Sequence, residues 1–107
     1  MNNYRLSFLP QFSEDLNHAV EYITHVLMNP SAANDLIDSV EAAIYERLNN
    51  SPEAFEQYLS KKQRLHPYYR IYVKNYVIYY VVIHTSEGPV MEVRRLLNNR
   101  QSKETIL

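Results

Sequence analysis

The sequence contains no cysteine, and glycine occurs only once, at Gly88. Without cysteine the chain has no disulfide framework, no thiolate zinc site and no cysteine nucleophile, a composition that fits a reducing compartment. A single glycine also leaves no glycine-rich phosphate-binding loop, and no serine-nucleophile motif is present. Nucleotide-dependent or hydrolytic chemistry of these kinds is therefore not expected.

Long apolar runs are missing as well. The longest, residues 76–83, is far shorter than the roughly 20 residues that a membrane-spanning helix needs. Residues 1–10 lack a basic leader followed by an apolar run, so no signal peptide is predicted. We expect a soluble cytoplasmic protein with no membrane partner, whose residues 1–107 form one domain around one core.

Charge is divided unevenly along the chain. Residues 1–56 carry nine acidic and two basic side chains, whereas residues 57–107 carry nine basic and three acidic ones, so the halves stand at −7 and +6 and the total is −1. One interpretation is that the second half presents a basic surface to nucleic acid or to an acidic protein. The other is that the acids occupy the solvent-facing sides of helices.

Apolar periodicity predicts a strand followed by two helices in the first half. Residues 2–10 alternate and end at Pro10, which predicts a short strand. Ser13 is the predicted N-cap of the first helix, with Glu14 and Asp15 as acids of its first turn. Asn29 and Pro30 are predicted to cap and begin the second helix, which ends in "NNSPEAF". The expected apolar stripes are Leu16, Ala19, Val20, Ile23 and Leu27, then Ala33, Leu36, Ile37, Val40, Ile44 and Leu48.

The second half predicts three strands. Residues 56–65 are polar and are predicted to be a loop; Tyr69, Ile71 and Val73 then alternate with the residues that follow them, and "KN" predicts a tight turn in which Asn75 tolerates positive φ. Residues 76–84 are apolar on both faces and predict the central strand, "TSEGP" predicts a turn, and residues 90–99 predict the last strand. The predicted class is α+β, in the order β-α-α-β-β-β, with a helical hairpin packed on a small antiparallel sheet. The place of the first strand in the sheet stays open.

Six of the ten tyrosines lie in residues 66–84. Tyrosines can stack on unpaired bases, but they are also good strand formers, and we interpret Tyr79 and Tyr80 as structural. Tyr72 is the exception, because strand alternation places it on one face with Arg70 and Lys74. His66 lies close to Arg70 in sequence, where it could transfer protons; the alternative is an ordinary loop histidine.

Two further groups of polar residues stand out. Arg94, Arg95 and Arg100 cluster near the end of the last strand, and strict alternation would let only one of Arg94 and Arg95 share a face with Arg70. His18, Glu21 and His25 have the spacing of metal ligands, but a turn of 100° per residue puts them on the solvent side of the first helix. No metal site and no cofactor are predicted.

Four segments together resemble the RelE/ParE superfamily of toxins from bacterial type II toxin-antitoxin modules. They are "YRLSFLPQFSEDLNHAVEYI", "NPSAANDLIDSVEAAIYERLNNSPE", "HPYYRIYVKNYVIYYVV" and "VMEVRRLLNNR", and they span nearly the whole chain. The resemblance implies a toxin of plasmid-stabilisation systems, neutralised by a cognate antitoxin that covers its surface, as a hetero-oligomer or a homodimer. RelE-like members cut mRNA on the ribosome, whereas ParE-like members block DNA gyrase and are not nucleases.

Carried over residue by residue, the resemblance is partial. If the chain is a nuclease, the resemblance implies that Arg70 and Arg100 stabilise the phosphate charge and that His66 or Tyr72 transfers protons. Lys74, Arg94 and Arg95 would then bind the target or a nucleic acid. The chain departs from the nuclease pattern at three positions, which are Val77, Asn98 and Ile106. Gyrase inhibition is therefore narrowly favoured over mRNA cleavage, and a degenerate, non-toxic antitoxin-binding module is the third alternative.

Overall fold

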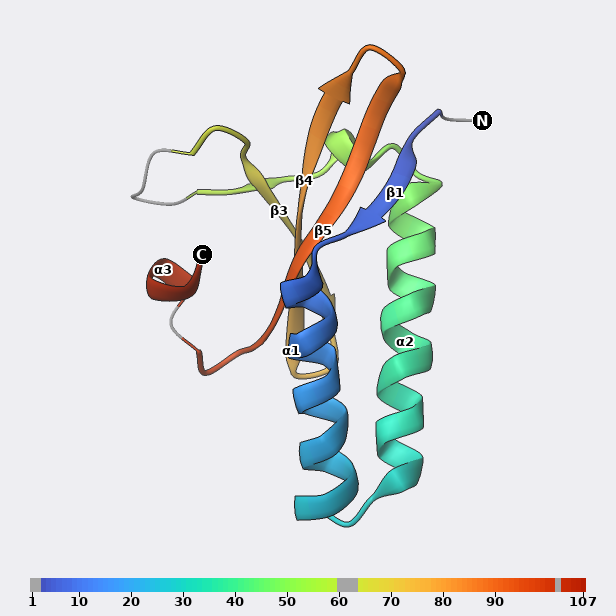
Figure 1. The fold of residues 1–107 in the computed structure, drawn as a ribbon, viewed down its shortest axis with the longest axis vertical. Coiled ribbons are helices and arrows are strands. Elements are labelled where there is room, and N and C mark those ends of the chain that lie inside the picture. Colours follow the sequence, from blue (N-terminus) through green and yellow to red (C-terminus); the bar gives the residue numbers. More distant parts are fainter. Residues whose placement is uncertain (1–2, 60–63, 102) are drawn as a thin grey trace.

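The computed structural model describes residues 3–59, 64–101 and 103–107, in which two long helices lie side by side against a sheet (Figure 1). The helices are α1 (Pro10–Glu21), continued by the π-helical turn η1 (Tyr22–Val26), and α2 (Pro30–Leu48). The strands are β1 (Arg5–Phe8), β2 (Gln57–Tyr58), β3 (Tyr68–Val73), β4 (Tyr76–Thr85) and β5 (Gly88–Asn98). The 3-10 turn η2 (Pro52–Ala54) and the short helix α3 (Lys103–Ile106) complete the chain. The predicted α+β class and helical hairpin are confirmed.

The five strands form one sheet in the order β1-β5-β4-β3-β2. As predicted, β3, β4 and β5 are antiparallel neighbours and β4 is central. β1 pairs in parallel with β5, so the sheet as a whole is mixed. The two residues of β2 belong to the segment that was predicted to be a loop, and residues 60–63 of that segment lie outside the described residues.

Both long helices begin at a proline, rather than at the acidic residues that follow Ser13. α1 begins at Pro10 with Leu9 as its N-cap, so the prediction of Ser13 as the cap was wrong. The ring of Pro10 fixes a helical φ, and its missing N–H would have had no partner in the first turn. The prediction for α2 is confirmed, because the Asn29 side chain accepts a hydrogen bond from the Ala32 N–H at 3.1 Å and Pro30 is the first helical residue.

The apolar stripe of the first helix stops short of its predicted end. Ala19 is buried and Ile23 is half-buried, but Leu27 is 55% exposed, so its predicted burial was wrong. The π-helical turn η1 explains the difference, since it adds a residue to one turn and rotates everything beyond it. In α2 the stripe is regular, and Leu36, Val40 and other predicted residues are buried.

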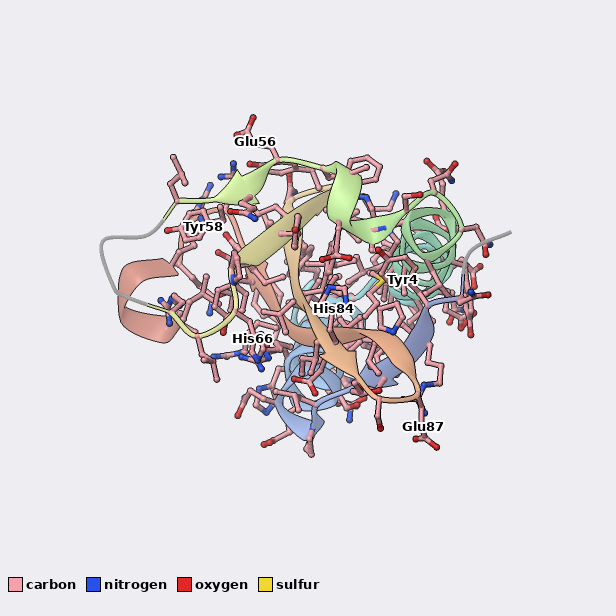
Figure 2. All side chains as sticks on the ribbon, turned by 90° about the horizontal axis from the view of Figure 1, so that it is seen from above. Tyr4, Glu56, Tyr58, His66, His84 and Glu87 are labelled. Carbon is pink, nitrogen blue, oxygen red and sulfur yellow. The ribbon has the colours of Figure 1, made fainter. Side chains whose placement is uncertain are left out.

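Apolar side chains cover both faces of the sheet. The helix-covered face packs against α1 and α2 and includes Tyr69, Ile71, Val73, Ile78, Tyr80, Val82, Met91, Val93 and Leu96. The other face, here called the tail-covered face, carries Tyr68, Val77, Tyr79, Val81 and Leu97, with Ile106 and Leu107 of the tail (residues 103–107) packed on it. Figures 1 and 2 show α3 on the side of the sheet away from the two long helices.

The predicted roles of the strand residues are largely confirmed. Tyr79 and Tyr80 are 1% and 0% exposed, and the Tyr80 hydroxyl donates to the Pro52 carbonyl at 2.7 Å. In the β3–β4 turn the left-handed conformation falls on Lys74, with φ of 54°, rather than on Asn75. Within the described residues, no helix combines the length and apolar character that crossing a membrane requires.

Candidate functional site

The tail-covered face combines arginines and tyrosines from four strands and the segment before β3. Its members are Arg64, Arg70, Arg94, Arg95, Tyr58, Tyr68 and Tyr79. Tyr79 is central, with its ring edge-on to Tyr58 at 5.7 Å and to Tyr68 at 6.2 Å between centroids. Burial raises the pKa of Tyr79 to about 12, so this phenol stays protonated at neutral pH and is a poor proton acceptor.

Arg70 lies at the exposed margin of this face. It is the direct cross-strand partner of Tyr79, and its guanidinium carbon lies 5.2 Å from the Tyr58 ring centroid and 5.7 Å from that of Tyr72. Its ion pair with the highly exposed Glu56 is long, at 3.4 Å, and such a pair neutralises little charge. The structure therefore brings Arg70 and Tyr72 together with a cationic charge available to a partner.

A β-bulge decides where Arg94 and Arg95 point. Tyr79 pairs with Arg95 while Tyr80 pairs with Val93, so Arg94 is the extra residue. A bulge interrupts alternation, and the Arg94 guanidinium lies 5.9 Å from the ring centroid of Tyr68 on the tail-covered face. The expectation that only one of the two arginines could share the face of Arg70 was wrong for this reason.

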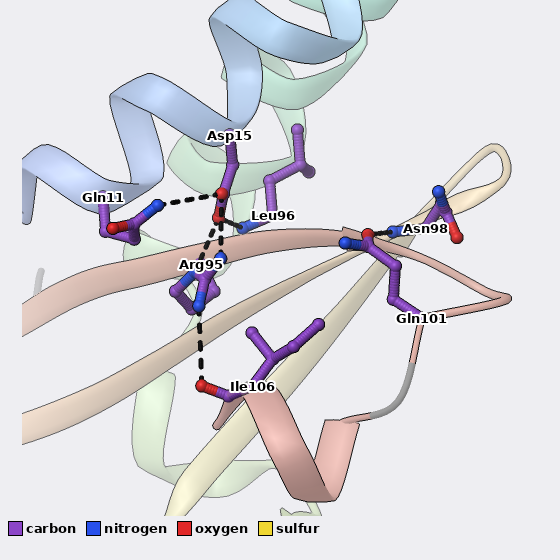
Figure 3. Close-up of polar contacts among 7 residues, drawn as sticks. All are labelled: Gln11, Asp15, Arg95, Leu96, Asn98, Gln101 and Ile106. Carbon is purple, nitrogen blue, oxygen red and sulfur yellow. Dashed lines mark hydrogen bonds and ion pairs between the residues drawn. The ribbon is translucent and has the colours of Figure 1, made fainter.

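Carboxylates neutralise both of these arginines. Arg94 Nε lies 2.8 Å from a Glu92 oxygen. Arg95 makes a two-pronged contact with Asp15 of α1, at 2.7 Å from Nε and 2.9 Å from Nη2, and this hydrogen bonding raises the pKa of Arg95 (Figure 3). Asp15 also accepts the Leu96 N–H at 3.0 Å, just beyond the last residue of β5 that β1 pairs with. No sequence pattern predicts this role of Asp15, which was expected only to be an acid of the first helical turn.

The remaining predicted site residues are dispersed. His66 is half-buried in the segment before β3, and Figure 2 places it with Tyr58 on the side of α3. Lys74 is exposed in the β3–β4 turn. Arg100 lines a groove of about 760 Å³ that opens on the helix-covered side, between α1 with η1 and the β3–β4 turn. The structure therefore does not bring Arg100 to the surroundings of Arg70.

A second groove follows the outer edge of β3. It has a volume of about 720 Å³ and its lining includes Arg47, Phe55, Ile71 and Tyr72. The strand β2 pairs only with Tyr68 and Tyr69, so within the described residues the rest of this edge has no strand partner. Unpaired strand edges of this kind accept extended peptides as an additional strand.

The residues with metal-ligand spacing lie where the helical count placed them. His25 and Glu21 form an exposed pair, with 3.3 Å between His25 Nε2 and the carboxylate, and His18 is exposed as well. Within residues 3–59, 64–101 and 103–107, no group of three histidine or acidic side chains is arranged to hold a metal ion.

A polar cluster at the other end of the sheet escaped sequence analysis, because its members are far apart in the chain. The Tyr4 hydroxyl donates to Glu53 at 2.7 Å, and the other carboxylate oxygen of Glu53 lies 2.8 Å from His84 Nε2. The hydrogen bond to Glu53 raises the pKa of Tyr4 to about 12, and the bonds from Tyr4 and then His84 lower the pKa of Glu53. The cluster ties the start of β1 and the end of β4 to η2.

A helical hairpin on a five-stranded mixed sheet is the architecture of RelE/ParE-like toxins. A family described as ParE toxin of type II toxin-antitoxin system, parDE, matches residues 6–102. The chain belongs to this family, and the resemblance seen in the sequence is confirmed. No curated protein matches the chain.

Proposed function

We propose that this chain is the growth-inhibiting toxin of a type II pair, that a cognate antitoxin keeps it inactive in the cytoplasm, and that it acts by blocking DNA gyrase. The observation that carries the proposal is the family match over residues 6–102, taken with the neutralisation of Arg94 and Arg95 by carboxylates of the same chain. Arginines that are already paired with carboxylates are suited to packing against a protein rather than to stabilising the charge of a cleaved phosphate.

The chemistry of RNA cleavage also favours gyrase over mRNA as the target. Cleavage needs a proton acceptor, a proton donor and a cation at the developing phosphorane charge. The central phenol, Tyr79, has a pKa of about 12, and Arg100 lies on the helix-covered side, away from Arg70. Of the four residues predicted to be catalytic in a nuclease, Arg70, Tyr72 and His66 remain for such a reaction.

The groove beside β3 supports antitoxin binding. An extended antitoxin segment would add a strand to the outer edge of β3 and lie over Ile71 and Tyr72. Tyr72 is 66% exposed, and an aromatic side chain of that size on an open edge is a typical anchor for a protein partner. The result would be a toxin-antitoxin hetero-oligomer.

The test is to express the chain from a tightly controlled promoter in bacteria and to follow growth, plasmid supercoiling and mRNA integrity in the same cells. The proposal predicts growth arrest, altered supercoiling or DNA breaks, and intact mRNA. Codon-phased cuts in translated mRNA would contradict it. Unimpaired growth with soluble, folded protein would instead favour a degenerate module that only binds its antitoxin.

The second candidate function is ribosome-dependent mRNA cleavage, favoured by one observation. The Arg70 guanidinium and the Tyr72 ring lie 5.7 Å apart at the exposed margin of the tail-covered face, where a phosphate and a base could bind together. If cleavage occurs, Arg70→Ala should abolish it and Arg100→Ala should lower it less, because Arg100 lies elsewhere. Full growth arrest by the Arg70→Ala, Arg100→Ala double variant would exclude this nuclease mechanism.

A further inference from the structure

Arg64 lies beside the tail, and only part of its guanidinium has hydrogen-bond partners. Its Nη1 donates a hydrogen bond to the Leu107 carbonyl, and its guanidinium carbon lies 5.1 Å from the centroid of the Tyr68 ring. Its other two nitrogens, Nε and Nη2, are buried and find no hydrogen-bond partner among residues 3–59, 64–101 and 103–107. The edge of the guanidinium formed by Nε and Nη2 is thus shielded from water and makes no hydrogen bond.

Leaving this edge buried and unpaired costs free energy. A guanidinium keeps its proton under all ordinary conditions, so it cannot become neutral when it is buried. A buried charge without a counterion is strongly unfavourable, and two donor nitrogens without hydrogen-bond partners add to the penalty. The arrangement therefore requires an anion that the described residues do not supply.

Arg95, on the same face, shows which anion fits. Its Nε and Nη2 atoms, the same two that are unused in Arg64, bind the two oxygens of Asp15 at 2.7 and 2.9 Å. Arg94 likewise uses Nε to bind the Glu92 carboxylate at 2.8 Å. A planar carboxylate matches the two parallel N–H groups of this edge.

We propose that the Nε and Nη2 edge of Arg64 is a binding site for a carboxylate, supplied by an acidic side chain of the protein that covers this face. The inference rests on the proposed function in one respect only, which is that the protein concerned is the antitoxin. The segment that contains Arg64 belongs to the half of the chain that carries +6, which attracts an acidic segment. When that segment binds, it lies beside the tail at Leu107 and completes the pairing of the arginines.

The test uses the purified full chain with acetate as the carboxylate probe, inorganic phosphate as the competing oxyanion, and chloride at the same ionic strength as the reference. Arginine Nε–H signals are followed by NMR and Tm by calorimetry. Acetate is expected to shift the Arg64 Nε–H signal saturably and to raise Tm by about 3 °C relative to chloride. The rise in Tm should vanish in Arg64→Gln, which lacks the reporter signal, and both effects should persist in Arg5→Gln, a matched loss of an exposed arginine on β1.

Three results would overturn the proposal. They are no saturable shift in the unmodified chain, an undiminished rise of Tm with acetate in Arg64→Gln, and a response to phosphate without one to acetate, which would assign the site to a different anion. A variant that fails to fold is recognised by its lost amide dispersion, and Arg64→Lys, which keeps the charge without the two-pronged edge, then replaces it and should lose the rise in Tm. Because binding is measured without reference to growth, a harmless chain that still binds acetate would refute the function and leave this site standing.

Discussion

At the scale of single residues, acidic side chains make contacts between distant segments that their positions in the sequence do not suggest. Asp15 was predicted to be an ordinary acid of the first helical turn, yet it joins α1 to β5 through Arg95 and the Leu96 N–H. Nothing local in the sequence signals that contact, because the partners are 80 and 81 positions away. Only the packing of α1 beside the part of β5 that β1 leaves unpaired brings them together.

The Asp15–Arg95 pair gives a direct prediction of stability. The two side chains are 9% and 20% exposed, so Asp15→Ala leaves a largely buried, unpaired guanidinium and should lower the free energy of unfolding by about 3 kcal/mol. Urea denaturation measures this, with Glu14→Ala as the exposed control, which should change stability by less than about 0.5 kcal/mol. Replacing Arg95 by methionine in the Asp15→Ala background should recover part of the loss; no recovery would contradict this account.

A second prediction concerns the pH dependence of stability at Glu53. Hydrogen bonds from Tyr4 and then His84 lower the pKa of Glu53 below 4.5, its value in an unfolded chain. A lowered carboxyl pKa contributes stability that is present above about pH 4.5 and is lost as the pH falls through the folded-state pKa. Glu53→Gln should therefore flatten the acid limb of a Tm-against-pH curve, whereas Glu41→Gln, an exposed acid of α2, should not. Identical acid limbs in Glu53→Gln and the unmodified chain would exclude the effect.

At the scale of elements, the regular stretches could be predicted and the irregular ones could not. The period of α2 and the alternation of β3 identify elements and buried faces because burial repeats along them. The bulge at Arg94, the π-helical turn η1 and the parallel pairing of β1 each depend on contacts between distant segments. The prediction of the candidate site was the least accurate, because the bulge changed which face Arg94 occupies and the fold separated Arg100 from Arg70.

The turn between the helices offers a test of local strain. Met28 adopts φ of 53° and is 77% exposed, so it bears a left-handed conformation that favours glycine and gains little from burial. Met28→Gly should raise the free energy of unfolding by about 0.5 to 1 kcal/mol, since glycine commonly follows a helix in this conformation. Met28→Ala keeps the strained conformation and should not gain. If calorimetry shows that glycine and alanine shift Tm equally, strain at this turn is not the cause.

At the scale of the whole molecule, the fold draws the two oppositely charged halves of the sequence together. Asp15 with Arg95, Glu56 with Arg70 and Glu53 with His84 each pair the acidic first half with the basic second half. Part of the predicted basic surface is thus used inside the molecule, whereas the exposed margin around Arg70, the buried edge of Arg64, and the exposed Lys74 and Arg100 remain for partners. This distribution favours protein targets over a polyanion, whose binding depends on many unpaired cations.

The central claim, that the chain acts on gyrase rather than on mRNA, is tested most directly with purified components. The chain is added to DNA gyrase with relaxed plasmid and ATP and, in parallel, to translating ribosomes. The account predicts that supercoiling falls with increasing chain concentration while the mRNA on ribosomes stays intact. Undiminished supercoiling together with codon-phased mRNA cuts would contradict it.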